Sequence, residues 1–260
     1  MKIHTMNNQQ YNTSRNLDLQ QEKVINAFLL KNNFFQFFKE YEGVVREIDF
    51  NLEPQKQFDG VDFEIIQKDK IINIDSKTQT KQYLNNPIPT FCLELLFTNK
   101  YGKDIVGWFD KDNSTDYYLW GWIDNCNIIT KNGCQFVEKP EDIHEARFMI
   151  ISKEKLKNKL IELNILIQKE IALKYLKEKN KKNIYFAYEP NIYKFFTIEE
   201  KKKYKGKFPK NANFCYTYNN PNMPEKPFNL VLNISFYKTI CEDYYKFKDG
   251  IWYSNKNGEW

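Results

Sequence analysis

Two short apolar runs rich in β-branched residues, joined by a polar segment, constrain the fold of this chain more than any other feature. The runs are Val61–Ile66 and Ile71–Thr78, and the four residues between them read Gln-Lys-Asp-Lys. Runs of this length, separated by a short polar turn, predict an antiparallel β-hairpin. Side chains alternate between the two faces of a strand, so we expect Asp75 and Lys77 to share one face.

Two carboxylates converge on this predicted hairpin, Asp62 from its first strand and Asp75 from its second. Burying an ionised carboxylate is unfavourable by several kcal/mol unless the group is paired or binds a metal ion. Lys77 neutralises one of the two charges. The remaining negative charge suits a hard cation that prefers oxygen ligands, so the pattern predicts a Mg²⁺ site, which Mn²⁺ would also occupy.

Asp62, followed by Asp75-Ser76-Lys77 on the next strand, resembles the signature of the PD-(D/E)XK nuclease superfamily, over roughly residues 18–155. The resemblance implies a restriction-endonuclease-like fold and metal-dependent cleavage of DNA. It further implies that Asp62 and Asp75 hold the metal and that Lys77 assists catalysis. Some members carry a glutamine two residues after the lysine, and Gln79 stands there as a catalytic candidate. The family often adds a glutamate from the preceding helix, here Glu22, as a catalytic residue and metal ligand.

The chain departs from this signature because no proline precedes Asp62. The local sequence of residues 58–62 is Phe-Asp-Gly-Val-Asp, which makes Asp59 an alternative metal ligand. Glu22 also has a second interpretation, since an acidic residue in the first turn of a helix is favoured by the helix dipole. That helix is predicted to begin at Asp18 and to run without glycine or proline towards Gly43.

Further apolar runs predict an α/β fold with a central mixed sheet of about five strands flanked by helices. The additional strands are expected at 91–97, 105–109, 117–123 and 146–151, followed by a long helix from Ser152 to about Lys179. We expect a flexible N-terminus (1–17), a nuclease-like core (18–180) and a C-terminal lobe rich in aromatic residues and lysine (181–260), which either stands alone or belongs to the same domain. In that lobe, 228–237 is predicted as a strand and 248–250 as the turn of a terminal hairpin.

Composition excludes several classes of protein. Five cysteines without a C-x-x-C pair give no disulfide framework or zinc ribbon, and two histidines disfavour zinc hydrolases and Ser-His-Asp enzymes. No apolar run is long enough to span a bilayer, so we expect a cytoplasmic protein without membrane contact. The net charge of +5, from 39 basic and 34 acidic residues, permits nucleic-acid binding without requiring it.

One segment of the C-terminal lobe interleaves cations with aromatic rings, as surfaces that bind phosphates and stack bases do. A solvated loop of a lysine-rich protein has the same composition, so both interpretations stay open. The candidate nucleic-acid-binding residues are Lys201, Lys202, Lys203, Tyr204, Lys205 and Lys207.

These observations predict a Mg²⁺-dependent phosphodiester hydrolase that acts on DNA more readily than on RNA, in restriction, repair, phage biology or host defence. The alternative is a nuclease-fold protein without activity that binds nucleic acid or inhibits a protein partner. A homodimer is compatible with either function.

Overall fold

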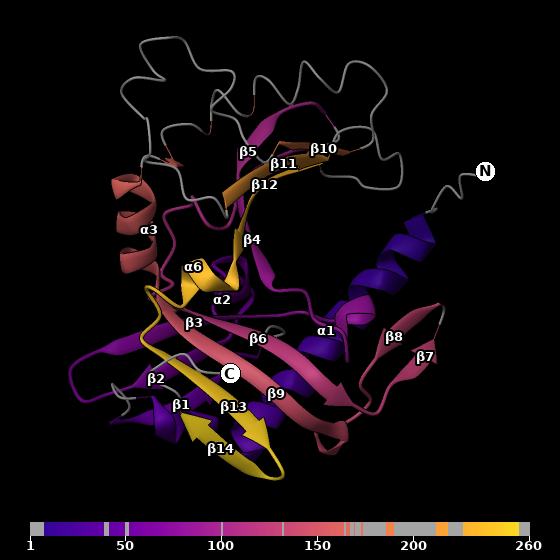
Figure 1. Ribbon diagram of the computed structural model, residues 1–260, viewed down its shortest axis with the longest axis vertical. Coiled ribbons are helices and arrows are strands. Elements are labelled where there is room, and N and C mark those ends of the chain that lie inside the picture. The colour runs from indigo at the N-terminus through magenta and orange to yellow at the C-terminus, as the bar shows by residue number, and fades with distance from the viewer. Residues whose placement is uncertain are drawn as a thin grey trace. The chain divides into compact units, whose positions relative to one another are not determined.

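The computed structural model describes residues 8–38, 42–49, 52–99, 101–131, 133–163, 165–166, 169, 173, 186–189, 212–217 and 226–254. They form two compact units, each built on its own β-sheet (Figure 1). The seven-stranded unit lies within Gln9–Ile88, Asn113–Glu154 and Ile240–Trp260. The five-stranded unit lies within Pro89–Asp112 and Lys155–Thr239. Neither unit is continuous in sequence, because the chain leaves the first unit twice and returns to it twice.

The seven-stranded sheet is mixed, which confirms the predicted α/β class, but the expectation of about five strands was wrong. Its strands, in spatial order, are β1 (Val44–Glu47), β2 (Phe63–Ile66), β3 (Ile71–Thr78), β6 (Tyr117–Cys126), β9 (Ile143–Ser152), β13 (Asp243–Lys248) and β14 (Ile251–Ser254). Only β3 and β6 pair in parallel, and the other neighbours are antiparallel. The predicted β2–β3 hairpin is confirmed, with Phe63 opposite Ile74. The predicted terminal hairpin is also present as β13–β14.

Helix α1 (Asn8–Lys31) begins ten residues before the predicted start and ends well short of Gly43. It ends because Asn33 adopts a left-handed conformation (φ 53°), which asparagine tolerates better than most residues, and a 3₁₀ turn, η1 (Phe34–Phe37), follows. The unit also contains α2 (Pro54–Phe58), the 3₁₀ turns η2 (Lys81–Tyr83) and η3 (Pro140–Asp142), and a small hairpin of β7 (Ile129–Lys131) and β8 (Cys134–Phe136). No helix in the described part of the chain is long and apolar enough to cross a membrane.

The apolar stripe of α1 packs on one face of the seven-stranded sheet. Ile25, Phe28 and Leu29 are almost fully buried against a cluster that includes Ile72 and Ile74 of β3. The last strands complete this core, because Trp252 Nε1 donates a hydrogen bond to the carbonyl oxygen of Asn32 at 2.8 Å. Strand β14 is thereby joined to the turn that follows α1.

The opposite face of the same sheet carries the large aromatic residues of β6. Tyr118, Trp120 and Trp122 have no exposed surface, so they are packing residues of this face. Strand alternation places Asp75 and Lys77 of β3 on this face, away from α1. The candidate catalytic side chains therefore lie on the side of the sheet that α1 does not cover.

The five-stranded sheet is antiparallel, with the order β10 (Phe186–Glu189), β11 (Ala212–Thr217), β12 (Lys226–Asn233), β4 (Thr90–Thr98) and β5 (Asp104–Val106). The strand at 91–97 was expected in the same sheet as β3, but β4 pairs with β12 from the C-terminal part of the chain. Helix α3 (Lys153–Glu162) begins where it was predicted but ends at Glu162, well before the predicted end near Lys179. The predicted strand to residue 237 was wrong at its end, because the Asn233 side chain accepts a hydrogen bond from Ser235 N and starts the short helix α6 (Ile234–Tyr237).

Candidate active site

The β2–β3 hairpin brings Asp62, Asp75 and Lys77 together. Asp62 lies one residue before β2, where its backbone N–H donates to Ile74 O, and its Oδ2 accepts a hydrogen bond from Ser76 N at 2.6 Å. Lys77 Nζ lies 2.6 Å from Asp75 Oδ1. Asp62 is 4% exposed and Asp75 is not exposed at all. Two buried carboxylates and the partly exposed side chain of Lys77 thus lie together on neighbouring strands.

Burial and mutual repulsion govern the protonation of the two carboxyl groups. Burial, followed by the charge of Asp75, raises the pKa of Asp62 well above its usual range. Burial also raises the pKa of Asp75, although the ammonium of Lys77 opposes this effect. For Lys77, the attraction of both carboxylates outweighs burial and raises its pKa. The cluster therefore holds a permanently charged lysine and an excess of negative charge whenever both carboxyl groups are ionised.

Gly60 closes the site next to Asp75. Its φ of +75° is a conformation that residues with a side chain rarely adopt, and a Cβ atom at this position would lie 3.1 Å from Asp75 Oδ2. Because residue 60 is glycine, the backbone can lie this close to the carboxylate of Asp75. This position lies within the segment that departs from the expected proline-containing signature.

Two residues near Asp75 were missed in the sequence. Tyr118 lies opposite Asp75 in the parallel β3–β6 register, and burial together with the charge of Asp75 raises the pKa of its hydroxyl group. Lys153 is only 7% exposed, and its Nζ donates a hydrogen bond to Asn113 O at 3.2 Å. The positive charge of Lys153 opposes the rise in the pKa of Asp75 that burial causes. No local pattern indicates either residue, because both reach the site through non-local pairing.

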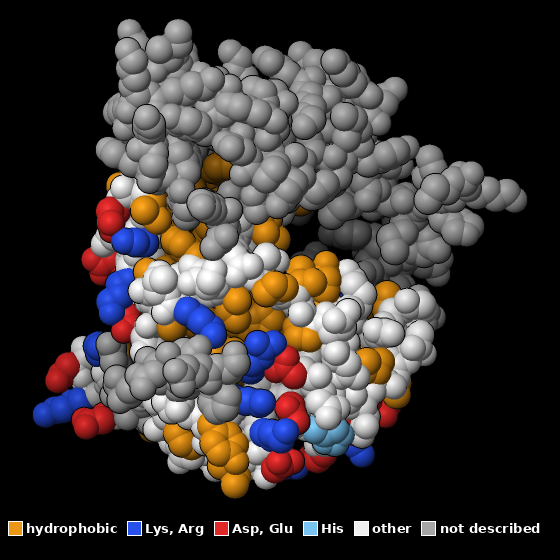
Figure 2. All heavy atoms as spheres, viewed as in Figure 1, with side chains coloured by type: hydrophobic (Ala, Val, Ile, Leu, Met, Phe, Trp, Pro, Cys, Tyr) orange, Lys and Arg blue, Asp and Glu red, His pale blue; other side chains and the backbone are white. Residues whose placement is uncertain are grey.

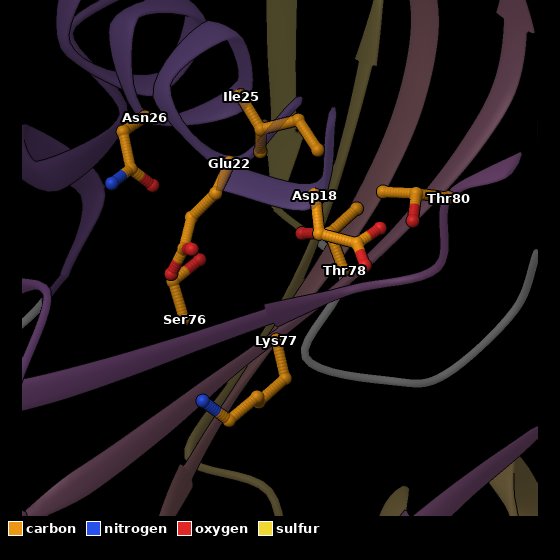
Figure 3. Close-up of a pocket in the computed structure, with 8 residues that line it drawn as sticks. All are labelled: Asp18, Glu22, Ile25, Asn26, Ser76, Lys77, Thr78 and Thr80. Atoms are coloured by element: carbon orange, nitrogen blue, oxygen red, sulfur yellow. The ribbon is translucent and has the colours of Figure 1, made fainter. Parts of the chain in front are cut away.

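Glu22 and Gln79 are placed differently from the three central residues. Glu22 extends from α1 towards the other face of β3, where Ser76 points, while the Lys77 side chain extends away from the helix (Figure 3). The charge of Glu22 nevertheless contributes to the raised pKa values of Asp62 and Lys77. The carboxamide of Gln79 bonds the backbone of Ile88 twice, as donor and as acceptor, both at 2.9 Å.

Asp59, the alternative metal ligand, contacts α2. The side-chain nitrogen of Gln55, in α2, donates a hydrogen bond to Asp59 Oδ2 at 3.4 Å. Among the described residues, no three acidic, histidine or cysteine side chains gather as a ready set of metal ligands. The proposed nucleic-acid-binding residues 201–207 lie outside the described residues.

Charge on the surface is mixed. On the face shown in Figure 2, the basic and acidic side chains of the described residues alternate, and no extended patch of a single sign is visible among them.

Comparisons of the chain with protein-family models, with curated proteins and with solved structures find no match. The interpretation of the site consequently depends on its own geometry and chemistry.

Proposed function

We propose that this protein is a divalent-metal-dependent phosphodiester hydrolase that acts on DNA. The observation that supports this proposal is the buried cluster of Asp62, Asp75 and Lys77 on two adjacent strands. Buried charges of this kind are costly for folding, so a protein tends to retain them where they serve a site. The resemblance to the PD-(D/E)XK signature belongs to this proposal, as do the expected biological contexts of restriction, repair, phage biology and defence.

The residues present suit a hard divalent cation such as Mg²⁺. Asp75 Oδ1 is paired with Lys77, both oxygens of Asp75 are buried, and Asp62 offers a second buried carboxylate. Asp62 and Asp75 would hold the ion, because Mg²⁺ binds through one or two carboxylates and retains several of its waters. When bound, the ion would lower the pKa of a coordinated water and screen the charge of a phosphate.

Lys77 acts as a cation in this proposal and not as a general base. Its raised pKa keeps the amine protonated at neutral pH, so it has no lone pair with which to accept a proton. A fixed ammonium beside the carboxylates would orient a phosphate oxygen and stabilise negative charge that develops at phosphorus. Because the hairpin and the Ser76 N–H hold Asp62 in place, little rearrangement is needed before substrate binds.

Cleavage assays on matched variants test this function. Purified protein would be incubated with supercoiled DNA, single-stranded DNA and RNA, in the presence of Mg²⁺, Mn²⁺ or EDTA. Asp75→Asn and Lys77→Met are each expected to lower the metal-dependent rate by about 100-fold or more, the range found when a charge-stabilising group is removed. Asp69→Asn, in the exposed turn of the same hairpin, is the control and should cleave like the wild type. Equal cleavage by Asp75→Asn and the wild type would contradict the assignment.

A second candidate is a protein that binds nucleic acid or a protein partner without cleaving. The positions of Glu22 and Gln79 favour it, because one lies on the other face of β3 and the other is bonded to the backbone of Ile88. In that case Lys77 serves only to neutralise Asp75. Absence of cleavage under every metal condition, combined with retained binding of a DNA duplex by Asp75→Asn and wild type alike, would support this candidate.

A further inference from the structure

Lys153, a buried lysine of the seven-stranded unit, is a close neighbour of Asp75. It is only 7% exposed, although lysine is almost never buried unless its charge has partners. The strand register brings it near the candidate metal site, since Asp75 lies opposite Tyr118, and Tyr118 lies opposite Ile151, two residues before Lys153. A buried cation and a buried carboxylate of the candidate site are thus neighbours within one unit.

The hydrogen bonds of the Lys153 ammonium group lead to the same carboxylate. Its Nζ donates to the backbone oxygen of Asn113 at 3.2 Å and to the side-chain oxygen of the same residue. Asn113 in turn lies beside Gly60, because its Nδ2 is 3.9 Å from the position that a Cβ of Gly60 would occupy. Asp75 Oδ2 is 3.1 Å from that position. Lys153 is therefore anchored beside Gly60, which faces Asp75 Oδ2.

Both ends of the Lys153 side chain are fixed. At the backbone, Lys153 N donates to Asp116 O at 2.9 Å, and Asp116 Oδ2 accepts from Asn73 N at 2.8 Å. The Asn73 side chain also donates to Ser114 O at 2.9 Å, so the segment that contains Asn113 is bonded to β3 itself. The ammonium group at the other end is bonded to Asn113. Its charge consequently has a defined place next to the candidate site.

The charges around the site balance when Lys153 is included. Asp62 and Asp75 contribute two negative charges when ionised, and Lys77 and Lys153 contribute two positive charges. The charge of Lys153 acts on Asp75, since it opposes the effect of burial on the pKa of that carboxyl. The two lysines differ in freedom, because the side chain of Lys77 is 35% exposed whereas Lys153 is enclosed. A divalent cation entering the site would be repelled by a lysine that cannot turn into solvent.

We propose that Lys153 is a built-in counter-ion of Asp75 that weakens the binding of a divalent cation at the candidate metal site. Lys153 supplies part of the positive charge that the cation would bring, so Asp62 and Asp75 bind the cation less tightly than they would without it. This inference rests on the metal site of the proposed function but not on cleavage. Neutralising Lys153 should therefore strengthen metal binding, which is the opposite of what the loss of a structural residue does.

Calorimetric titration of the full chain with Mg²⁺ alone, and separately with Mn²⁺ alone, tests the proposal. Lys153→Met and Lys153→Gln should each tighten binding by about tenfold or more, because each removes a cation next to a ligand. The glutamine variant keeps a hydrogen-bond donor for Asn113 and covers the case in which the methionine variant does not fold. Asn113→Ala, which releases the ammonium group from its anchor, should change the affinity in the same direction.

Two controls keep the charge and change its place. Lys153→Arg retains the cation and should bind the metal like the wild type. Lys68→Met removes a lysine from the exposed turn between β2 and β3, so it changes the net charge equally and should also bind like the wild type. In an Asp75→Asn background, Lys153→Met should no longer change the affinity, because the carboxylate on which Lys153 acts is absent.

The outcomes separate this inference from the hydrolase proposal. Tighter metal binding by the neutral Lys153 variants supports the inference, even if the wild type cleaves no substrate. Cleavage by the wild type, combined with unchanged or weaker metal binding in the neutral variants, overturns the inference and leaves the hydrolase standing. The inference is also overturned if neither the wild type nor these variants bind either metal, or if Lys68→Met tightens binding as much as Lys153→Met does.

Discussion

At the scale of single residues, Ser76 joins two neighbourhoods that lie on opposite faces of β3. Its backbone N–H donates to Asp62 in the charged cluster, while its side chain lines a polar pocket between α1 and β3. Its position between Asp75 and Lys77 follows from the alternation of a strand, which is why the pattern Asp-Ser-Lys could be interpreted from sequence. Gly60 could not be interpreted in the same way, because its approach to Asp75 depends on the conformation of a loop.

The raised pKa values of Asp62 and Asp75 predict how stability depends on pH. A carboxyl group with a higher pKa in the folded state binds more protons when folded, so the free energy of unfolding falls as the pH rises from about 4 through the folded-state pKa. The loss is about 1.4 kcal/mol per unit of difference between the folded and unfolded pKa. Asp62→Asn keeps an acceptor for Ser76 N but should remove the contribution of Asp62 to the fall of the free energy of unfolding with pH.

Urea unfolding in EDTA at pH values from 4 to 8 would measure the effect. Asp69→Asn, which changes an exposed carboxyl group of the same hairpin, should leave the profile unchanged. If the profile of Asp62→Asn runs parallel to that of the wild type, the pKa of Asp62 is not raised by folding.

Gly60→Ala is expected to destabilise the fold by about 1–3 kcal/mol, because it places a side chain in a strained conformation and against Asp75. Gly250→Ala is the matched control, since Gly250 has a φ of +80° but no atom within 4 Å of the position that a Cβ would occupy. Its cost should be about 1–2 kcal/mol, from conformation alone. Chemical denaturation of both variants gives the difference, and a Gly60 cost no larger than that of Gly250 would show that the contact with Asp75 is unimportant.

At the scale of elements, an ion network connects β1, α2 and β2. Glu64 of β2 is 3% exposed and is paired with Arg46 of β1 and Lys56 of α2. Burial tends to raise the pKa of Glu64, but its hydrogen bonds with Lys56 and Arg46 outweigh this and lower it. The network holds α2 beside the strand that carries Asp62.

Glu64→Ala should therefore destabilise the protein by about 1–3 kcal/mol, since it leaves two cations without their buried partner while Glu53 still pairs with both. Glu141→Ala removes the partner of Lys31 in a pair exposed to solvent on both sides, and should change stability far less than Glu64→Ala does. The stabilising contribution of Glu64 is present above the unfolded pKa of glutamate and is lost as the pH falls through its lower folded value. Similar losses in the two variants at pH 7 would contradict a special role for the buried carboxylate.

Elements whose signals are local were predicted well. The run Ile71–Thr78 matches β3 at both ends, because its composition and period extend over the whole strand. The partner of β3 was not predictable in this way, since β6 lies some forty residues further along the chain and pairs in parallel. Tyr118 and Lys153 reach Asp75 through that pairing and its neighbours, so their absence from the predicted site has the same cause.

At the scale of the whole molecule, the seven-stranded unit is assembled from three separate stretches of the chain. The prediction of a single sheet was wrong because it assumed that strands neighbouring in sequence also pair in space. Strand β4 follows β3 in the chain but pairs with β12, which brings residues 226–233 beside residues 90–98. The residue pattern within one strand does not indicate which other strand it pairs with.

The contact between the last strand and the first helix gives a prediction at this scale. Trp252→Ala should cost about 3–5 kcal/mol, because it empties a buried position beside Phe28 and leaves the carbonyl oxygen of Asn32 without its hydrogen bond. Tyr253→Ala, at the next position and 42% exposed, should cost less than about 1 kcal/mol. Thermal or urea unfolding distinguishes the two, and equal losses would mean that β14 contributes little to the core.

The late position of β13 and β14 in the sequence has a consequence for the order of synthesis. When a ribosome has produced residues 143–152, the long apolar strand β9 has β6 on one side, but the strand that covers its other side has not been made. About ninety more residues must be translated first, which at roughly 5–20 residues per second leaves an apolar edge open for several seconds. The nascent chain should therefore depend on chaperones, and a pause or premature stop before residue 243 should favour aggregation.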